Sequence, residues 1–522
     1  MNRDESLKRI RESPAGWDFL VIGGGATGLG AAVEAAARGY RTVLVEQCDF
    51  AKATSSRSTK LIHGGLRYLR QGNLFLVRES MSERSLLLQN APHLVHPLSF
   101  IVPNYAWWEA PYYGAGLKLY DLLAGKFRWN RSRRISREEV LEHLPTLQTR
   151  GLRGGIRYFD GQFDDARLAI CLAQTLENLG GVPVNYARVE SFQKENGRVC
   201  GVMARDMETG QSHEVRARAI VNATGVFSDT VRRMDDPQAP GVITVSQGTH
   251  VVLDKSFLPG DSALMIPSTD DGRLLFAIPW NDRTLVGTTD TPVRETSLEP
   301  RPFHEEIEFL LRHAGRYLAG QPVKRDILSA FAGLRPLVGV RGRSTAGLSR
   351  AHTLLVSASG LVTIAGGKWT TYRRMGEETV NAAERAAGLP ARTSRTKDLR
   401  LHGWSNEIQG ASHWTVYGDD SRRLAVLLKE NIELDKPLHP RLPYCAGEVV
   451  WAVRQEMART VEDVLARRTR ALLLDTRASV EIAPAVAALI AKELGCDTQW
   501  EKEQIFAFRT LASRYLLERD TA

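Results

Sequence analysis

The sequence has no long apolar run and few cysteines. No stretch approaches the roughly eighteen consecutive apolar residues of a membrane-spanning helix, so we expect none. The N-terminal residues, MNRDESLKRIRESPAG, lack the apolar centre of a secretory signal, which argues against export. The cysteines are scattered without a C-x-x-C pair: Cys48, Cys171, Cys200, Cys445 and Cys496. Such a set is typical of reduced thiols in a cytosolic protein and predicts neither a disulfide framework nor a metal site.

Charge of neither sign is gathered in blocks. The 522 residues include 69 Lys and Arg against 60 Asp and Glu, a formal net charge of +9. Basic residues are spread along the chain without a nucleic-acid-binding motif, so we expect no nucleic-acid partner. The positive balance favours an anionic substrate or an anionic membrane surface. A content of 43% apolar and 25% charged residues is typical of a globular protein.

Residues 17–48 hold the most informative pattern, WDFLVIGGGATGLGAAVEAAARGYRTVLVEQC. The short apolar run at 18–22 predicts a buried parallel strand. Residues 31–38 predict a helix that Gly39 ends, and 41–45 predict a second strand. The stretch therefore predicts a strand–turn–helix–strand unit.

The turn of this unit supplies G-x-G-x-x-G through Gly23, Gly25 and Gly28. The first glycine permits a tight turn, the second lets a pyrophosphate approach the backbone, and the third lets the helix pack closely on the strand. The helix N-terminus then offers free N–H groups to the phosphates. Glu46, at the end of the second strand, can accept a hydrogen bond from a ribose hydroxyl. The unit predicts a dinucleotide site and leaves NAD and FAD open.

Residues 53–73, ATSSRSTKLIHGGLRYLRQGN, are too rich in Ser, Thr and Gly for a helix, so we expect a long loop. Its position directly after the second strand favours a loop that turns back over the cofactor, with a polar surface loop as the alternative. The side chains that could bind phosphates are Thr54, Ser55, Ser56, Ser58, Lys60, His63 and Arg67.

Residues 104–129, NYAWWEAPYYGAGLKLYDLLAGKFRW, concentrate aromatic side chains beside Lys118, Lys126 and Arg128, although aromatics make up only 7% of the chain. Interior packing would explain this cluster. An amphipathic segment lying in a membrane interface would explain it equally well, and both interpretations stay open.

The whole pattern predicts an α/β fold in which two domains interleave within residues 1–400. A Rossmann-like dinucleotide-binding domain is expected from residues of about 17–75, 150–235 and 350–385. A substrate domain on a mixed or antiparallel sheet is expected from residues of about 76–149 and 236–349, where segments such as GVITVSQGTHVVLD alternate like strands. Further on, apolar residues recur at helical spacing, so residues 401–522 predict a separate all-α domain.

Several short motifs follow one another along the chain: VIGGGATGLG, ATSSRSTKLIHGGLRYL, VNATG, IPW followed by VGTTD, AGLRPL and GGKWTTYR. In this combination and order the chain resembles the FAD-dependent glycerol-3-phosphate dehydrogenases of the aerobic, quinone-linked type. The later stretch EVVWAVRQEMARTVEDVLARRTRALLLD is similar to the helical C-terminal domain of that family. The resemblance thus covers nearly the whole chain.

The resemblance implies a two-domain flavoprotein fold like that of D-amino-acid and glycine oxidases, with FAD as the cofactor. It implies oxidation of glycerol 3-phosphate to dihydroxyacetone phosphate and transfer of the electrons to a membrane quinone. We therefore expect a cytoplasmic protein that is peripheral on the inner face of the cell membrane. A homo-oligomer is left open.

Matching motifs imply a substrate site formed by Arg67, Tyr68, Arg335, Arg350 and Lys368, with Arg343 as the alternative to Arg350. A phosphate dianion needs several fixed positive charges, preferably arginines, which agrees with this set.

The expected catalytic residues are His250, Arg335, Lys368 and His63. Oxidation takes a hydride from carbon 2 of the substrate and a proton from its hydroxyl, so a base is required. His250 is the first candidate and His63 the second. Lys368 or Arg335 would stabilise negative charge on the reduced flavin.

The residues expected to bind FAD come from the motifs that carry the resemblance. They are Gly23, Gly25, Gly28, Glu46, Thr54, Ser55, Ser56, Lys60, His63, Gly64, Ala223, Gly225, Gly366, Gly367, Lys368, Trp369 and Thr370.

Other functions remain open on the same core. One is an oxidase of glycerol 3-phosphate that reduces O2 to H2O2, since sequence separates electron acceptors poorly. A second is an FAD-dependent oxidoreductase of an amine or amino acid, which would need a carboxylate clamp instead of a phosphate clamp. A third is a flavin-binding sensor or structural subunit without catalysis.

Overall fold

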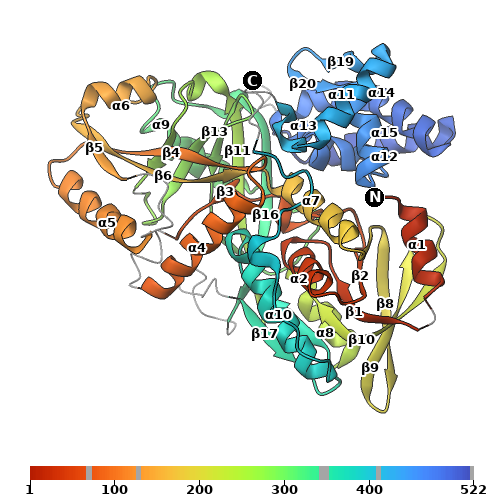
Figure 1. Ribbon diagram of the computed structural model, residues 1–522. Coiled ribbons are helices and arrows are strands. Elements are labelled where there is room, and N and C mark those ends of the chain that lie inside the picture. Colours follow the sequence, from red (N-terminus) through yellow and green to blue (C-terminus); the bar gives the residue numbers. More distant parts are fainter. Residues whose placement is uncertain are drawn as a thin grey trace.

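The computed structural model describes residues 1–13, 15–65, 73–124, 131–267, 269–339, 352–406 and 413–517. Two β-sheets form the body of the molecule, and a helical region of the last hundred residues lies against them, drawn in blue at the upper right of Figure 1. This is the α/β architecture expected from the sequence, including the helical C-terminal region.

The first sheet has eight strands, with the order β17-β18-β10-β1-β2-β7 and with β9 and β8 continuing from β10. The pairs that join β18, β10, β1, β2 and β7 are parallel. The bounds are β1 (Trp17–Ile22), β2 (Thr42–Val45), β7 (Val182–Val184), β8 (Ala187–Glu195), β9 (Arg198–Asp206), β10 (Ser212–Asn222), β17 (Thr353–Val356) and β18 (Val362–Ala365). The predicted strand–turn–helix–strand unit is confirmed, because α2 (Ala26–Ala37) joins β1 to β2.

Both faces of this sheet are buried, since alternate residues of each strand point to opposite sides. Phe19 and Val21 pack with α2, α7 (Asp165–Asn178) and α10 (Tyr372–Ala387). Leu20 and Ile22 face the other way, against α1 (Arg3–Arg11), α8 (Ser228–Asp235) and the β8–β9 pair. The near-continuous apolar run in β1 follows from this two-sided cover.

The second sheet has ten strands and is mixed. Its order is β15-β11-β14-β13-β12-β4-β6-β3, with β16 also paired to β11 and β5 to β6, and only the β12–β4 pair is parallel. The bounds are β3 (Leu61–Ile62), β4 (Val95–Asn104), β5 (Arg133–Ile135), β6 (Gly154–Phe163), β11 (Ile243–Asp254), β12 (Ala263–Ile266), β13 (Leu275–Trp280), β14 (Arg283–Gly287), β15 (Thr291–Val293) and β16 (Ile327–Val338).

Helices cover this sheet on both sides. Leu264 and Val286 pack with α6 (Arg137–His143) and α9 (His304–Gly315). Phe100 and Leu285 share a core with the C-terminal region. Two further helices, α4 (Leu74–Asn90) and α5 (Glu109–Ala124), lie at the centre and at the left of Figure 1, respectively.

The C-terminal region is helical apart from a short hairpin that the sequence pattern did not indicate. Its elements are α11 (Asp420–Glu430), β19 (Pro437–His439), β20 (Leu442–Cys445), α12 (Ala446–Glu456), the π-helical turn η11 (Asp463–Arg468), α13 (Ala471–Leu474), α14 (Thr476–Leu494) and α15 (Thr498–Ala512). Among the described helices, none combines the length and the apolar character needed to cross a membrane.

Candidate FAD and substrate site

A cavity of about 1770 Å³ lies where the two sheets meet. On one side its wall contains Ile22, Val45, Ala223 and Ile364, which stand at or just beyond the carboxyl ends of the parallel strands β1, β2, β10 and β18. Open α/β sheets bind their ligands at this edge. The second sheet supplies the opposite wall, with side chains from β4, β6, β11, β13 and β16.

The glycine turn has no room for side chains. Gly23 has φ +111°, and a Cβ there would lie 2.7 Å from the carbonyl oxygen of Ala223. A Cβ at Gly28 would lie 1.8 Å from the carbonyl oxygen of Gly23. Gly25, the N-cap residue of α2, provides no side-chain cap, and Gly25, Ala26 and Thr27 at this helix end line the cavity. The turn therefore has the tight form that a pyrophosphate needs.

Glu46 lies beside this turn and lines the cavity. Its carboxylate accepts hydrogen bonds from the backbone N–H of Gly24 at 2.6 Å and of Cys48 at 2.9 Å. Burial raises the pKa of Glu46, and the two N–H donors oppose that rise. An acceptor fixed in this way at the end of β2 suits the ribose hydroxyls of a dinucleotide.

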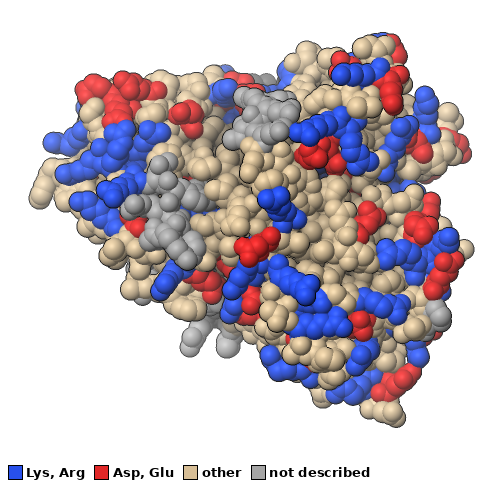
Figure 2. Space-filling model, viewed as in Figure 1, with Lys and Arg blue, Asp and Glu red and all other residues tan. Residues whose placement is uncertain are grey.

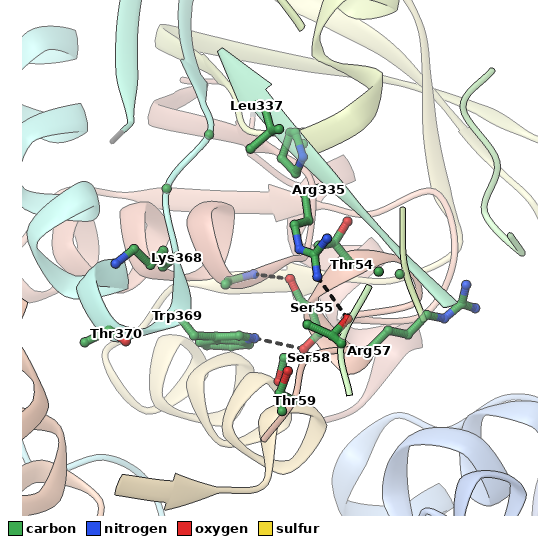
Figure 3. A pocket seen from close by; sticks show the side chains of 18 of the residues that line it. Thr54, Ser55, Arg57, Ser58, Thr59, Arg335, Leu337, Lys368, Trp369 and Thr370 are labelled. Atoms are coloured by element: carbon green, nitrogen blue, oxygen red, sulfur yellow. Dashed lines mark hydrogen bonds between the residues drawn. The ribbon is translucent and has the colours of Figure 1, made fainter. Parts of the chain in front are cut away.

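The Ser/Thr-rich loop, described over residues 53–65, does turn back over the glycine turn. The hydroxyl of Ser55 accepts from the N–H of Ala26, and the Ser55 carbonyl accepts from the indole N–H of Trp369, both at 2.9 Å. Figure 3 shows these hydrogen bonds meeting at Ser55. The loop residues Thr54, Ser55, Ser58, Thr59 and His63 line the cavity.

Other predicted cofactor residues of this loop lie behind the cavity wall. The ammonium of Lys60 is fully buried and donates to Asp165 Oδ2 at 2.7 Å and to the Ser56 carbonyl at 2.8 Å. The N–H of Gly64 donates to the carboxylate of Asp160. Lys60 therefore neutralises a buried carboxylate instead of facing a phosphate.

The distant GGKWTT segment completes the first wall. Gly366 and Gly367 have φ of +79° and +87°, a conformation that favours glycine. Both line the cavity together with Lys368, Trp369, Thr370, Ala223 and Gly225. In Figure 3 the Lys368 side chain extends away from Arg335, so the two cations do not converge on one point.

His250 and Arg335 face the cavity from neighbouring strands of the second sheet. The β11–β16 register pairs His250 with Phe331 and Ser246 with Arg335. The His250 ring stacks on Phe331 at a centroid distance of 4.9 Å, and its Nε2 lies 2.9 Å from the hydroxyl of Thr59. Its Nδ1 is buried and has no hydrogen-bond partner among the described residues.

The charges around His250 favour its neutral form. Burial lowers the pKa of His250 well below its usual value, and the nearby positive charges of Lys60 and Arg335 lower it further. Arg335 itself is half-buried and donates from Nη2 to the hydroxyl of Thr288 at 3.0 Å and from Nη1 to the carbonyl of Gln247 at 3.3 Å. The second sheet thus presents a neutral imidazole and a guanidinium to one cavity.

Two supporting residues escaped the sequence analysis. Thr59 contacts His250 but stood among many hydroxyls of the loop. The buried carboxylate of Glu306 accepts from Gln247, Thr249, Thr289 and Thr291, and so joins the QGTH and GTTD motifs. A glutamate in the first turn of a helix gives no signal for this role. The predicted residues Arg67, Tyr68, Arg350 and Arg343 lie outside the described residues.

A glycine turn at the carboxyl edge of a parallel sheet, faced by a second sheet that presents a histidine and an arginine, is the construction of a two-domain flavin oxidoreductase. The family described as FAD dependent oxidoreductase matches residues 18–373, and the C-terminal domain of alpha-glycerophosphate oxidase matches residues 362–504.

Comparison with similar proteins shows which group of flavin oxidoreductases the chain is similar to. The chain is 42% identical to mitochondrial glycerol-3-phosphate dehydrogenase of Homo sapiens, over 94% of this chain and 72% of that protein. It is 38% identical to the mitochondrial glycerol-3-phosphate dehydrogenase of Arabidopsis thaliana, over 94% of this chain and 84% of that protein. The X-ray structure of the glycerol-3-phosphate dehydrogenase from Bacillus halodurans complexed with FAD has a TM-score of 0.77 and 29% identity over 99% of both chains.

The chain belongs to the family of FAD-dependent glycerol-3-phosphate dehydrogenases. The cofactor and the fold expected from the sequence motifs are thereby confirmed. L-alpha-glycerophosphate oxidase from Mycoplasma pneumoniae, at a TM-score of 0.56 and 16% identity, shares the fold.

The lowered pKa of His250 predicts the pH range in which its ring takes up a proton. Because its pKa is lowered, the ring should stay neutral as the pH falls through about 6.5 and should take up a proton only below that value. Ring-nitrogen NMR of the histidine-labelled holoenzyme measures this directly, with the His250→Gln variant to assign the signal. Protonation of His250 at or above pH of about 6.5 would contradict the electrostatic description.

Proposed function

We propose that the protein oxidises sn-glycerol 3-phosphate to dihydroxyacetone phosphate on bound FAD and passes the electrons to a membrane quinone. The observation that carries this proposal is the pair of His250 and Arg335, which face the dinucleotide-binding wall from adjacent strands. The identity to mitochondrial glycerol-3-phosphate dehydrogenases supports the choice of substrate.

In the proposed mechanism Arg335 binds the substrate anion, because a guanidinium offers paired donors that match phosphate oxygens. In the tautomer that carries its proton on Nδ1, His250 Nε2 accepts the proton of the substrate hydroxyl, and that hydroxyl takes the place of Thr59 as the hydrogen-bond partner of Nε2. FAD, when bound, supplies the acceptor for the hydride from carbon 2. His63, which also lines the cavity, is the second candidate for the base.

The remaining lining of the cavity suits an apolar electron acceptor. Away from the glycine turn its wall is built from aromatic and aliphatic side chains of β4, β13 and α5, including Phe100, Phe276, Tyr113 and Leu117. Such a surface favours a quinone ring over a charged acceptor.

An exposed apolar surface on α4 and α5 supports a position at a membrane. Exposed fractions are 75% for Phe75, 77% for Trp107, 60% for Tyr112 and 76% for Leu122. Aromatic side chains of this kind are typical of membrane interfaces. Exposed basic side chains lie on α5 and at the neighbouring β5: Lys118, Arg131, Arg133 and Arg134. Figure 2 shows Lys and Arg side chains gathered at the left, where α5 and β5 lie in Figure 1. We propose that this face meets an anionic membrane on the cytoplasmic side.

Replacing Arg335 tests the substrate site. Arg335→Met should lower kcat/KM for glycerol 3-phosphate about 100-fold, because hydrogen bonds to charged groups are lost, while Arg335→Lys should keep part of the activity. The matched control is Arg312→Met on α9, whose side chain is exposed and paired with Asp270. Steady-state kinetics measure all three. An unchanged KM and kcat in Arg335→Met would refute the assignment.

Reoxidation of the reduced enzyme tests the electron acceptor. An oxidase is the second candidate, because the C-terminal region matches a domain described for alpha-glycerophosphate oxidase. We expect fast reoxidation by a ubiquinone analogue and slow reoxidation by air, followed through the flavin absorbance. Rapid H2O2 formation in air without quinone would favour the oxidase.

Vesicle flotation tests the membrane face. The double variant Trp107→Ala/Trp108→Ala should float with anionic vesicles several-fold less than wild type, since two interfacial anchors are lost. Phe506→Ala on α15, another residue with a highly exposed ring, is the control and should float like wild type. Equal flotation of all three proteins would exclude this face as the contact.

A further inference from the structure

Buried arginines of the C-terminal region contact the loops that surround the cofactor. Arg467, Arg468 and Arg470 are only 2%, 2% and 1% exposed and lie in or just after η11. A buried guanidinium requires hydrogen-bond acceptors that compensate its charge. The residues that supply these acceptors therefore show which parts of the protein the three arginines hold in place.

The first acceptors belong to the loop after β2. The carboxylate of Asp49 accepts from Nε of Arg467 and from Nη2 of Arg468, the latter at 3.0 Å. Asp49 follows Glu46 by three residues, and the N–H of Ala51 donates to the carbonyl of Gly24 at 3.0 Å. The arginines therefore fix the stretch that joins the ribose-binding acid to the glycine turn.

The next acceptors belong to the Ser/Thr-rich loop. Nη2 of Arg470 donates to the Ser56 carbonyl at 2.9 Å and to Asp165 Oδ1 at 2.8 Å. Lys60 binds the same carbonyl and the other oxygen of Asp165. Ser56 directly follows Ser55, whose hydroxyl binds the first turn of α2 and whose carbonyl binds Trp369. Arg470 thus supports the loop from behind at the point where it meets the cofactor wall.

The backbone of Arg470 adds an independent observation. Its φ is +67°, in the left-handed region that residues with a side chain rarely adopt. Such a conformation persists where the surrounding structure determines it. Here it directs the guanidinium out of the C-terminal region towards Ser56 and Asp165.

We propose that Arg470, with Arg467 and Arg468, is a positioning device for FAD, so that the C-terminal helical region controls cofactor retention without lining the cavity. All described residues that line the cavity lie between residues 22 and 370. This inference rests on FAD binding at the glycine turn, as in the proposed function. A role in domain packing alone would leave the loops, and therefore FAD release, unchanged.

The test measures FAD release from full-length holoenzyme diluted into FAD-free buffer, followed by the fluorescence of the freed flavin. Arg470→Met keeps an unbranched apolar stem but loses the guanidinium with its charge and donors, and we expect release about 10- to 100-fold faster than from wild type. Arg470→Lys should be intermediate, because one ammonium cannot reproduce the guanidinium fork.

The matched control is Arg38→Met at the far end of α2. Arg38 is as deeply buried and is paired with Glu34 and Glu384, so its loss costs stability away from the loops. It should release FAD at the wild-type rate.

The inference is overturned if Arg470→Met releases FAD no faster than wild type, or if both methionine variants release it equally fast. Should Arg470→Met fail to fold, the rate of Arg470→Lys against wild type decides by the same criterion. A wild-type protein that holds no FAD would overturn both this inference and the proposed function. A wild-type protein that holds FAD, with an Arg470→Met variant that releases it no faster, would overturn this inference alone.

Discussion

The absence of space at Gly28 is the constraint on which the site depends. Because α2 packs within contact of the turn before it, the backbone of residues 23–28 is forced against the ends of β1 and β10. Only this closeness leaves helix N–H groups open to a pyrophosphate. Three of the other residues expected to bind the cofactor are linked to the turn: Glu46 accepts from the N–H of Gly24, Ser55 accepts from the N–H of Ala26, and the indole N–H of Trp369 donates to the Ser55 carbonyl.

The second sheet presents His250 and Arg335 to the cavity from paired strands. Burial lowers the pKa of His250, and the positive charges of Lys60 and Arg335 lower it further, so the neutral ring is favoured. Of these two charges only that of Arg335 lines the cavity, where it favours an anionic substrate. Since Glu306 ties the QGTH and GTTD segments together, the position of His250 is set by the sheet and not by a flexible loop.

Much of this was predictable from local sequence. The glycine turn, Glu46 and the helix between the strands are specified within thirty residues, and the order of the motifs was enough to indicate FAD. Partners far apart in the chain could not be predicted in this way. The ion pair of Lys60 with Asp165 spans 105 residues and the contact of Arg470 with Ser56 spans 414, so neither leaves a periodic or local trace. Lys60 accordingly looked like a phosphate ligand although its charge is used inside the protein.

The aromatic segment at residues 104–129 illustrates a different limit of prediction from sequence. Composition alone left packing and membrane contact equally open for residues 104–129. The structure divides the segment, because Leu117 and Tyr120 are buried while Trp107 and Tyr112 are exposed. A periodic apolar face in the sequence shows that a helix is amphipathic. It does not show how much of that face the core buries and how much stays exposed to solvent.

Anaerobic mixing of the purified protein with sn-glycerol 3-phosphate shows directly whether this substrate reduces the bound flavin. The expected result is loss of the visible absorbance of oxidised FAD and formation of one dihydroxyacetone phosphate for each flavin reduced. A flavin that stays oxidised with glycerol 3-phosphate but is bleached by an amino acid such as glycine or sarcosine would contradict it.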